Sequence, residues 1–126
     1  MPEEYTSLVT ALKNLEQVED AKADPPTKVK LPMAEDEWDV RPDVVSYGIV
    51  LLQFEAAALN GDNLKQATAY SGSVHLFSLA RGGAGWVEQI TDTLKEHCES
   101  CWSLNNHTYE RESGLFHWEW TFQVEG

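Results

Sequence analysis

The chain has 126 residues, which fits a single domain that buries about two thirds of the surface its unfolded form exposes. Its apolar fraction of 42% and charged fraction of 24% are ordinary for a globular protein, and no apolar run approaches the ~18 residues of a membrane-spanning helix. Nine basic against 21 acidic residues give a net charge of -12, so phosphate is repelled and we expect no sequence-specific nucleic-acid binding.

The first predicted element is a helix from Glu3 to Leu15, because its apolar residues recur at helical spacing. From Glu16 to Asp43 the chain changes character: four prolines and an acidic run predict mostly loop, with a Pro-rich acidic loop at about 24–43. A short extended piece around Val29 to Leu31 is the one exception that we expect there.

Two strands follow. Val44 to Glu55 is an almost continuous run of β-forming residues, in which Gly48 marks either a bulge or a close backbone approach. Asn60-Gly61-Asp62 predicts a turn, and a second strand runs from Thr68 to Leu79.

After a glycine-rich break, the chain is predicted to form a helix from Trp86 to about Ser100, and then two strands, Trp102 to Glu112 and Leu115 to Glu125, joined by a hairpin at Ser113-Gly114. The last strand alternates most clearly. Its apolar side chains point one way and its polar side chains the other: Phe116, Trp118, Trp120, Phe122 and Val124 against His117, Glu119, Thr121, Gln123 and Glu125.

The order helix, strand, strand, helix, strand, strand requires no crossover connection. It predicts an α+β fold in which a four-stranded antiparallel sheet carries two helices on one face, as one domain over residues 1–126. The alternation of the last strand predicts that the other face of the sheet meets water or a polar partner.

Cys98 and Cys101 are the only cysteines. The acidic start Met1-Pro2-Glu3-Glu4 is unlike a secretory signal, so we expect the cytoplasm and free thiols. Zinc would need further ligands such as His97 or His107, and no second spaced pair exists. The pair ends a predicted helix, whereas a redox pair begins one, so packing as small apolar side chains is the favoured interpretation.

Other patterns offer weak chemical signals. Arg81-Gly82-Gly83-Ala84-Gly85-Trp86 lies where a phosphate loop sits, but it lacks the lysine and hydroxyl of such a loop and also suits a plain turn. His75, His97, His107 and His117 are scattered, and His117 with Glu119 forms a candidate base and partner on the polar face of the last strand.

Two further sets of residues allow either a ligand-binding or a purely structural interpretation. Trp102 and Tyr109 are candidates to stack on a ligand, although aromatic residues at strand spacing are more often core. The run from Glu35 to Asp39 is a candidate for a divalent cation, but it lacks the rhythm of a calcium loop, which favours a solvated loop. We therefore predict no catalytic, cofactor-binding or metal-binding residue.

The stretch from Pro42 to Val124 resembles a known family. The resemblance is carried by Pro42, Tyr47-Gly48-Ile49-Val50, Gly72-Ser73-Val74-His75-Leu76-Phe77, Trp102-Ser103-Leu104-Asn105, Tyr109-Glu110 and Gly114-Leu115-Phe116-His117-Trp118-Glu119-Trp120-Thr121-Phe122. These residues are similar to the tail-completion proteins of long-tailed phages and prophages, among them the tail terminators that cap the tail tube. The Pro-rich acidic loop departs from that pattern, and the first helix fits by position only.

The resemblance implies an α+β subunit that assembles as a ring, often a hexamer, without catalysis or cofactor. Its implied partners are copies of itself, the tail-tube protein and a head-completion or connector protein, first in the host cytoplasm and then in the virion tail. Three alternatives stay open: a head–tail connector or stopper, a small cytoplasmic ligand-binding domain or enzyme using His117, Glu119 and the glycine-rich turn, and a metal-binding module at Cys98 and Cys101.

Overall fold

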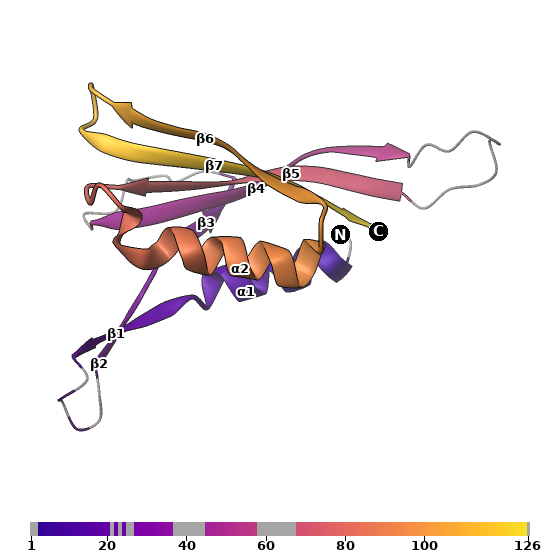
Figure 1. Cartoon of the computed structure of the whole chain (residues 1–126). Helices are drawn as coiled ribbons and strands as arrows, with labels where there is room; N and C mark the ends of the chain where they lie inside the picture. The colour runs from indigo at the N-terminus through magenta and orange to yellow at the C-terminus, as the bar shows by residue number, and fades with distance from the viewer. Residues whose placement is uncertain are drawn as a thin grey trace.

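The computed structural model of the chain describes residues 3–20, 22, 24, 27–36, 45–57 and 68–125 (Figure 1). In chain order its elements are α1 (Glu3–Lys13), β1 (Glu16–Asp20), β2 (Thr27–Lys30), β3 (Met33–Glu35), β4 (Ser46–Ala57), β5 (Thr68–Ser78), the 3-10 turn η1 (Gly83–Gly85), α2 (Trp86–Cys98), β6 (Trp102–Glu110) and β7 (Leu115–Glu125). The two predicted helices and the four predicted strands are present, with ends displaced by two residues or fewer.

The main sheet has five strands in the order β3-β4-β5-β7-β6, and β1 pairs with β2 in a separate two-stranded sheet. β3 runs parallel to β4, whereas the other neighbouring strands run antiparallel. The predicted four-stranded antiparallel sheet is therefore wrong. The sheet is mixed, it has a fifth strand, and a hairpin stands beside it.

β1, β2 and β3 lie in the segment expected to be mostly loop, where the sequence predicted only a short extended piece around Val29 to Leu31. β1 and β2 are rich in charged residues and form a hairpin that projects from the body of the molecule (Figure 1), so they lack the apolar alternation of a strand that covers a core. The extended piece expected around Val29 is part of β2. Of the acidic run, Glu35 ends β3 and Asp36 follows it, while 37–39 and the turn predicted at 60–62 lie outside the described residues.

β3 packs against β4 at a glycine. Met33 is the register partner of Gly48, and a Cβ atom built on Gly48 would lie 2.7 Å from the terminal methyl carbon of Met33. Gly48 therefore serves a close approach, one of the two predicted alternatives. The irregularity in β4 falls between Leu52 and Phe54 instead.

The connection through α2 is a crossover, contrary to the expectation that none is needed. β5 and β6 both pair antiparallel with β7, so they run in the same direction with β7 between them. α2 carries the chain from β5 past the position of β7 to the edge of the sheet. β7 then returns into the gap.

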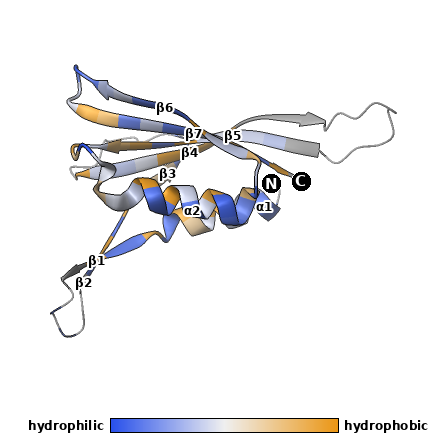
Figure 2. Cartoon of the chain, in the orientation of Figure 1, coloured by the Kyte–Doolittle hydropathy of each residue, from blue (hydrophilic) through white to orange (hydrophobic). Residues whose placement is uncertain are grey.

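Both helices cover one face of the sheet, and the core lies between them (Figure 1). Orange and blue segments alternate along α2 in Figure 2, as expected for a helix with one apolar stripe. The fully buried core residues include Leu8, Leu12, Val50, Val74, Leu76, Ile90, Leu94 and Trp120. Neither helix among the described residues has the length and apolar character that crossing a membrane requires.

The alternation predicted for the last strand is confirmed. In β7, Trp118, Trp120, Phe122 and Val124 are buried toward the helices, and Phe116 packs half-buried against the same core. Trp120 donates its indole N–H to the Thr91 hydroxyl oxygen of α2 at 3.2 Å, which satisfies the one polar atom of this large side chain.

Removing a core side chain from α1 tests whether this helix belongs to the folded unit. Leu8 is fully buried, so Leu8→Ala should lower the free energy of unfolding by about 2–5 kcal/mol. Leu104→Ala is the matched control, because Leu104 on β6 is 44% exposed and its truncation should cost well under about 1 kcal/mol. Urea denaturation followed by circular dichroism measures both. Equal losses would contradict the packing of α1 into the core.

Candidate functional site

The face of the sheet opposite the helices carries a cluster of aromatic and titratable side chains. In β5 and β7 the odd-numbered residues face this side, which places His75 and Phe77 of β5 beside His117 and Glu119 of β7. The ring of Phe77 stacks on that of His117 with centroids 4.3 Å apart, and on Tyr47 of β4 at 5.1 Å. Three strands thus contribute to one surface.

Hydrogen bonds link four side chains of this cluster in a row. Ser73 Oγ lies 3.0 Å from His75 Nε2, His75 Nδ1 lies 2.8 Å from His117 Nε2, and His117 Nδ1 lies 3.2 Å from a carboxylate oxygen of Glu110. Glu119 is a more distant partner, 4.0 Å from His75 Nε2. The row therefore connects β5 to β7 and β7 to β6.

The direction of these hydrogen bonds follows from the acceptor at the end of the row. An ionised Glu110 only accepts, so His117 carries its proton on Nδ1 and, when neutral, accepts at Nε2 from the Nδ1–H of His75. His75 Nε2 then accepts from the Ser73 hydroxyl. With both imidazoles neutral, every nitrogen of the pair is satisfied.

The row can take up one additional proton without losing a hydrogen bond. A protonated His117 can donate from both nitrogens, provided that His75 changes tautomer and donates to Ser73. If both rings are protonated, His75 Nδ1 and His117 Nε2 are both donors 2.8 Å apart, and their hydrogen bond is lost.

The surroundings of His75 also disfavour its protonation. Burial lowers the pKa of His75 below its usual value and the neighbouring His117 lowers it further, while Glu119 opposes them. Burial and the neighbouring ring thus favour the neutral form of His75.

The order serine, histidine, histidine, glutamate is suited to activating a hydroxyl group. The serine hydroxyl, however, is not accessible to a substrate. Ser73 is 0% exposed, so no substrate reaches its Oγ in this conformation. What the row does in this arrangement is to tie the side chains of three strands together. The hypothesis that His117 and Glu119 form the working pair needs revision, because Glu110 is the carboxylate bonded to His117 and Glu119 lies nearer His75.

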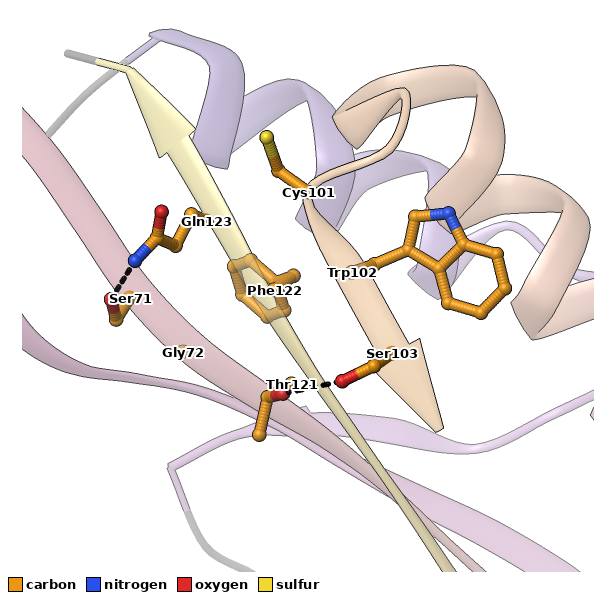
Figure 3. Close-up of a pocket in the computed structure, with 8 residues that line it drawn as sticks. All are labelled: Ser71, Gly72, Cys101, Trp102, Ser103, Thr121, Phe122 and Gln123. Atoms are coloured by element: carbon orange, nitrogen blue, oxygen red, sulfur yellow. Dashed lines mark hydrogen bonds between the residues drawn. The ribbon is translucent and has the colours of Figure 1, made fainter. Parts of the chain in front are cut away.

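A pocket of about 410 Å³ lies further along the sheet, where β5, β6 and β7 meet (Figure 3). Its polar lining is uncharged: the Gln123 amide donates to the Ser71 hydroxyl at 3.3 Å, and the Ser103 and Thr121 hydroxyls meet at 3.3 Å. The Trp102 indole turns toward α2 in Figure 3 and donates its N–H to the Glu99 carbonyl at 2.9 Å. Trp102 thereby packs against the core, which confirms the structural interpretation that the sequence favoured.

Tyr109, the other candidate for stacking, lies outside the core. It is 53% exposed on β6 and rests against Phe116 with ring centroids 4.8 Å apart. The core position that the sequence favoured for Tyr109 is therefore wrong.

The two cysteines differ in their environment. Cys98 is buried at the end of α2, Cys101 is exposed before β6, and both line a pocket of about 210 Å³ with His97 and Glu4. No group of three His, Cys, Asp or Glu side chains that could hold a metal ion occurs within the described ranges. His107, the other suggested ligand, stacks on Trp118 at 4.5 Å.

The glycine-rich segment before α2 makes a tight turn. Gly83, Ala84 and Gly85 all have positive φ angles, of 76°, 56° and 83°, a backbone conformation that favours glycine. A Cβ atom on Gly83 would also lie 2.7 Å from Val87, so the geometry of the turn accounts for these glycines without a phosphate ligand.

Sequence comparison adds no relative to this picture. Neither a scan against protein-family models nor a search of the curated proteins finds a match for the chain.

The two thiols should react at very different rates in the folded protein. Burial raises the pKa of Cys98 to about 12, with smaller contributions from Cys101 and Glu4, whereas Cys101 is exposed. At neutral pH we expect a thiol reagent to modify Cys101 at least about a hundredfold faster than Cys98, and both in denaturant. Peptide mass mapping identifies the modified residue. Cys101→Ser should abolish the fast reaction and Cys98→Ser should keep it; equal rates would show that Cys98 is accessible.

The histidine pair predicts that acid destabilises the fold. Because the native pKa of His75 lies below its unfolded value, the unfolded chain binds more protons, so stability is full above about pH 6.5 and declines as the pH falls toward the native pKa. Urea denaturation between pH 7.5 and pH 5.5 measures the decline. His75→Asn should flatten it, while His97→Asn on α2 should not. The same slope in all three proteins would refute the assignment to the pair.

Proposed function

We propose that this chain is a structural subunit of a phage or prophage tail, which assembles as a ring at the end of the tail tube and joins the tube to the head. Its partners are further copies of itself, in a ring that is often a hexamer, the tail-tube protein, and a head-completion or connector protein. It acts by association and performs no catalysis. It meets these partners in the host cytoplasm during assembly and remains in the virion tail.

The observation that carries this proposal is the exposed edge of the main sheet. β6 is nine residues long and is exposed along most of its length, and its side away from β7 has no strand partner among the described residues. Proteins normally protect such an edge with lysine, proline or other charges, whereas the eight residues Trp102 to Tyr109 contain no lysine, arginine, proline or acid. Apart from the register irregularity between Leu104 and Asn106, the edge has none of these protections, which favours a role in pairing with another chain.

The size and charge of the chain also suit a ring around DNA. A 126-residue domain has a diameter of about 36 Å, and six such domains in contact enclose a hole about 36 Å wide. A net charge of -12 on each subunit repels phosphate, so a duplex passing through the hole slides and does not bind. The resemblance of the stretch from Pro42 to Val124 to tail-completion proteins supports the same role.

Oligomeric mass in solution tests the proposal. Because copies with a charge of -12 repel one another, we expect association to rise with protein concentration and with added salt, which screens that repulsion. Sedimentation velocity and native mass spectrometry give the subunit number, and negative-stain imaging shows whether the particles are closed rings.

Binding to the tail-tube protein is the second part of this test. A protein that stays monomeric at every concentration and salt level, and does not bind tail-tube protein, would contradict the proposal. Labelling the chain in assembled particles separates the tail end of the tube from a connector or stopper position in the neck.

A further inference from the structure

The turn between α2 and β6 brings the two cysteines of the chain together. Cys101 donates its backbone N–H to the Cys98 carbonyl at 2.8 Å, so residues 98–101 form a hydrogen-bonded four-residue turn. Such a turn holds its first and last Cα atoms within about 7 Å, and a disulfide bond spans Cα separations of about 4.4–6.8 Å. The backbone of the folded chain therefore keeps the two cysteines in the range that a disulfide bridges.

The two thiols also share one opening. Both line the pocket of about 210 Å³ at the end of α2. Burial raises the pKa of Cys98 to about 12, and Cys101 adds to this effect because two neighbouring thiolates repel each other. Repulsion of this kind requires that the two sulfur atoms lie close together, so both side chains can meet within the pocket.

The turn has an unusual backbone at its first central residue. Glu99 has a φ of 52° and a ψ of -108°, the angles of a type II′ turn at a position that normally belongs to glycine. Its carbonyl accepts the indole N–H of Trp102 at 2.9 Å. The Cys101 carbonyl accepts the backbone N–H of Gln123, also at 2.9 Å. The surrounding structure thus holds a glutamate in a conformation that it would not adopt by preference.

A covalent bond across a turn that is already fixed is favoured by the folded state. In the unfolded chain the segment 98–101 samples many conformations, and Glu99 rarely has a positive φ. Folding removes this freedom before the bond forms, so closing the bond costs less conformational entropy in the folded protein than in the unfolded chain. By the same thermodynamic cycle, the bond stabilises the folded protein.

We propose that Cys98 and Cys101 form a redox modification site, at which a small disulfide oxidises the pair to an intramolecular disulfide bond that locks the turn between α2 and β6. In a reducing compartment the pair stays as two thiols, and in an oxidising one it closes. The site does not rest on the proposed function, because the turn of a single copy is sufficient for it.

The two cysteines take different parts in the reaction. Cys101 is exposed, so its thiolate attacks the small disulfide, and one half of that reagent leaves as a thiolate. Cys98 then attacks the Cys101 sulfur from within the pocket and expels the other half as a second thiolate. The two protons of the cysteines pass through water to the two departing thiolates. The cysteines lose two electrons, and the small disulfide gains them.

Equilibration with a neutral thiol couple tests the site. Glu4 and Glu99 line the pocket and repel an acidic reagent such as glutathione, so the full chain is incubated at neutral pH with mercaptoethanol and its disulfide at a series of ratios. Mass spectrometry after acid quenching should show a chain that is lighter by two hydrogen atoms and carries no reagent.

The same titration in urea measures the unfolded chain. We expect the equilibrium constant for closing the disulfide to be at least about tenfold larger in the folded protein than in urea. The oxidised protein should accordingly unfold at a higher temperature than the reduced protein.

Serine substitutions separate the two steps. Cys98→Ser should stop at the mixed disulfide on Cys101, because no second thiol displaces the reagent. Cys101→Ser should stay unmodified while it is folded, because its remaining cysteine is buried, and should react in urea. Circular dichroism verifies that both variants fold.

Three results would overturn the assignment. If the folded chain stops at the mixed disulfide, Cys98 does not reach Cys101. If the folded chain forms only disulfide-linked dimers, Cys101 pairs between copies. If the equilibrium constant is equal in the two states or smaller in the folded protein, the fold does not favour the bond. The ring proposal is unaffected by all three results, since none of them measures association without a covalent bond.

Discussion

The pairing register of β7 is the constraint on which the rest of the structure depends. This strand lies between β5 and β6, and its side chains alternate between the helix-covered core and the opposite face. A slip of one residue would move Trp118 and Trp120 out of the core and bring His117 and Glu119 into it. Burial of the tryptophans therefore also fixes the histidine pair, because the same register places His117 beside His75.

Local sequence patterns were sufficient for the helices and the four long strands, since each covers nine or more residues with a helical period, an alternation or a run of β-forming residues. They were insufficient for β1, β2 and β3, which have three to five residues each and no apolar face of their own. Strand order was also out of reach. β5 pairs with β7 and not with β6 because of contacts between distant segments. The periodicity of a single segment carries no information about such contacts.

The candidate site was predictable only in part, because a local pattern shows which face of a strand a side chain occupies but not which strands pair. Alternation placed His117 and Glu119 on the polar face of their strand, and the spacing of Ser73 and His75 puts both on one face of β5. The link between His75 and His117 joins residues 42 positions apart, and only the register of the sheet brings them together. Glu110 was missed because it comes from a third strand, across a hairpin turn whose exact pairing the sequence left open.

The crossover through α2 bears on how the chain is made. On a ribosome, β6 emerges before β7, yet in the main sheet its neighbour is β7 alone. Until β7 enters the gap between β5 and β6, the histidine row does not exist, and β5 ends the sheet as an unpaired edge. A nascent chain therefore exposes the edge of β5 until synthesis has passed the last hairpin and β7 covers that edge.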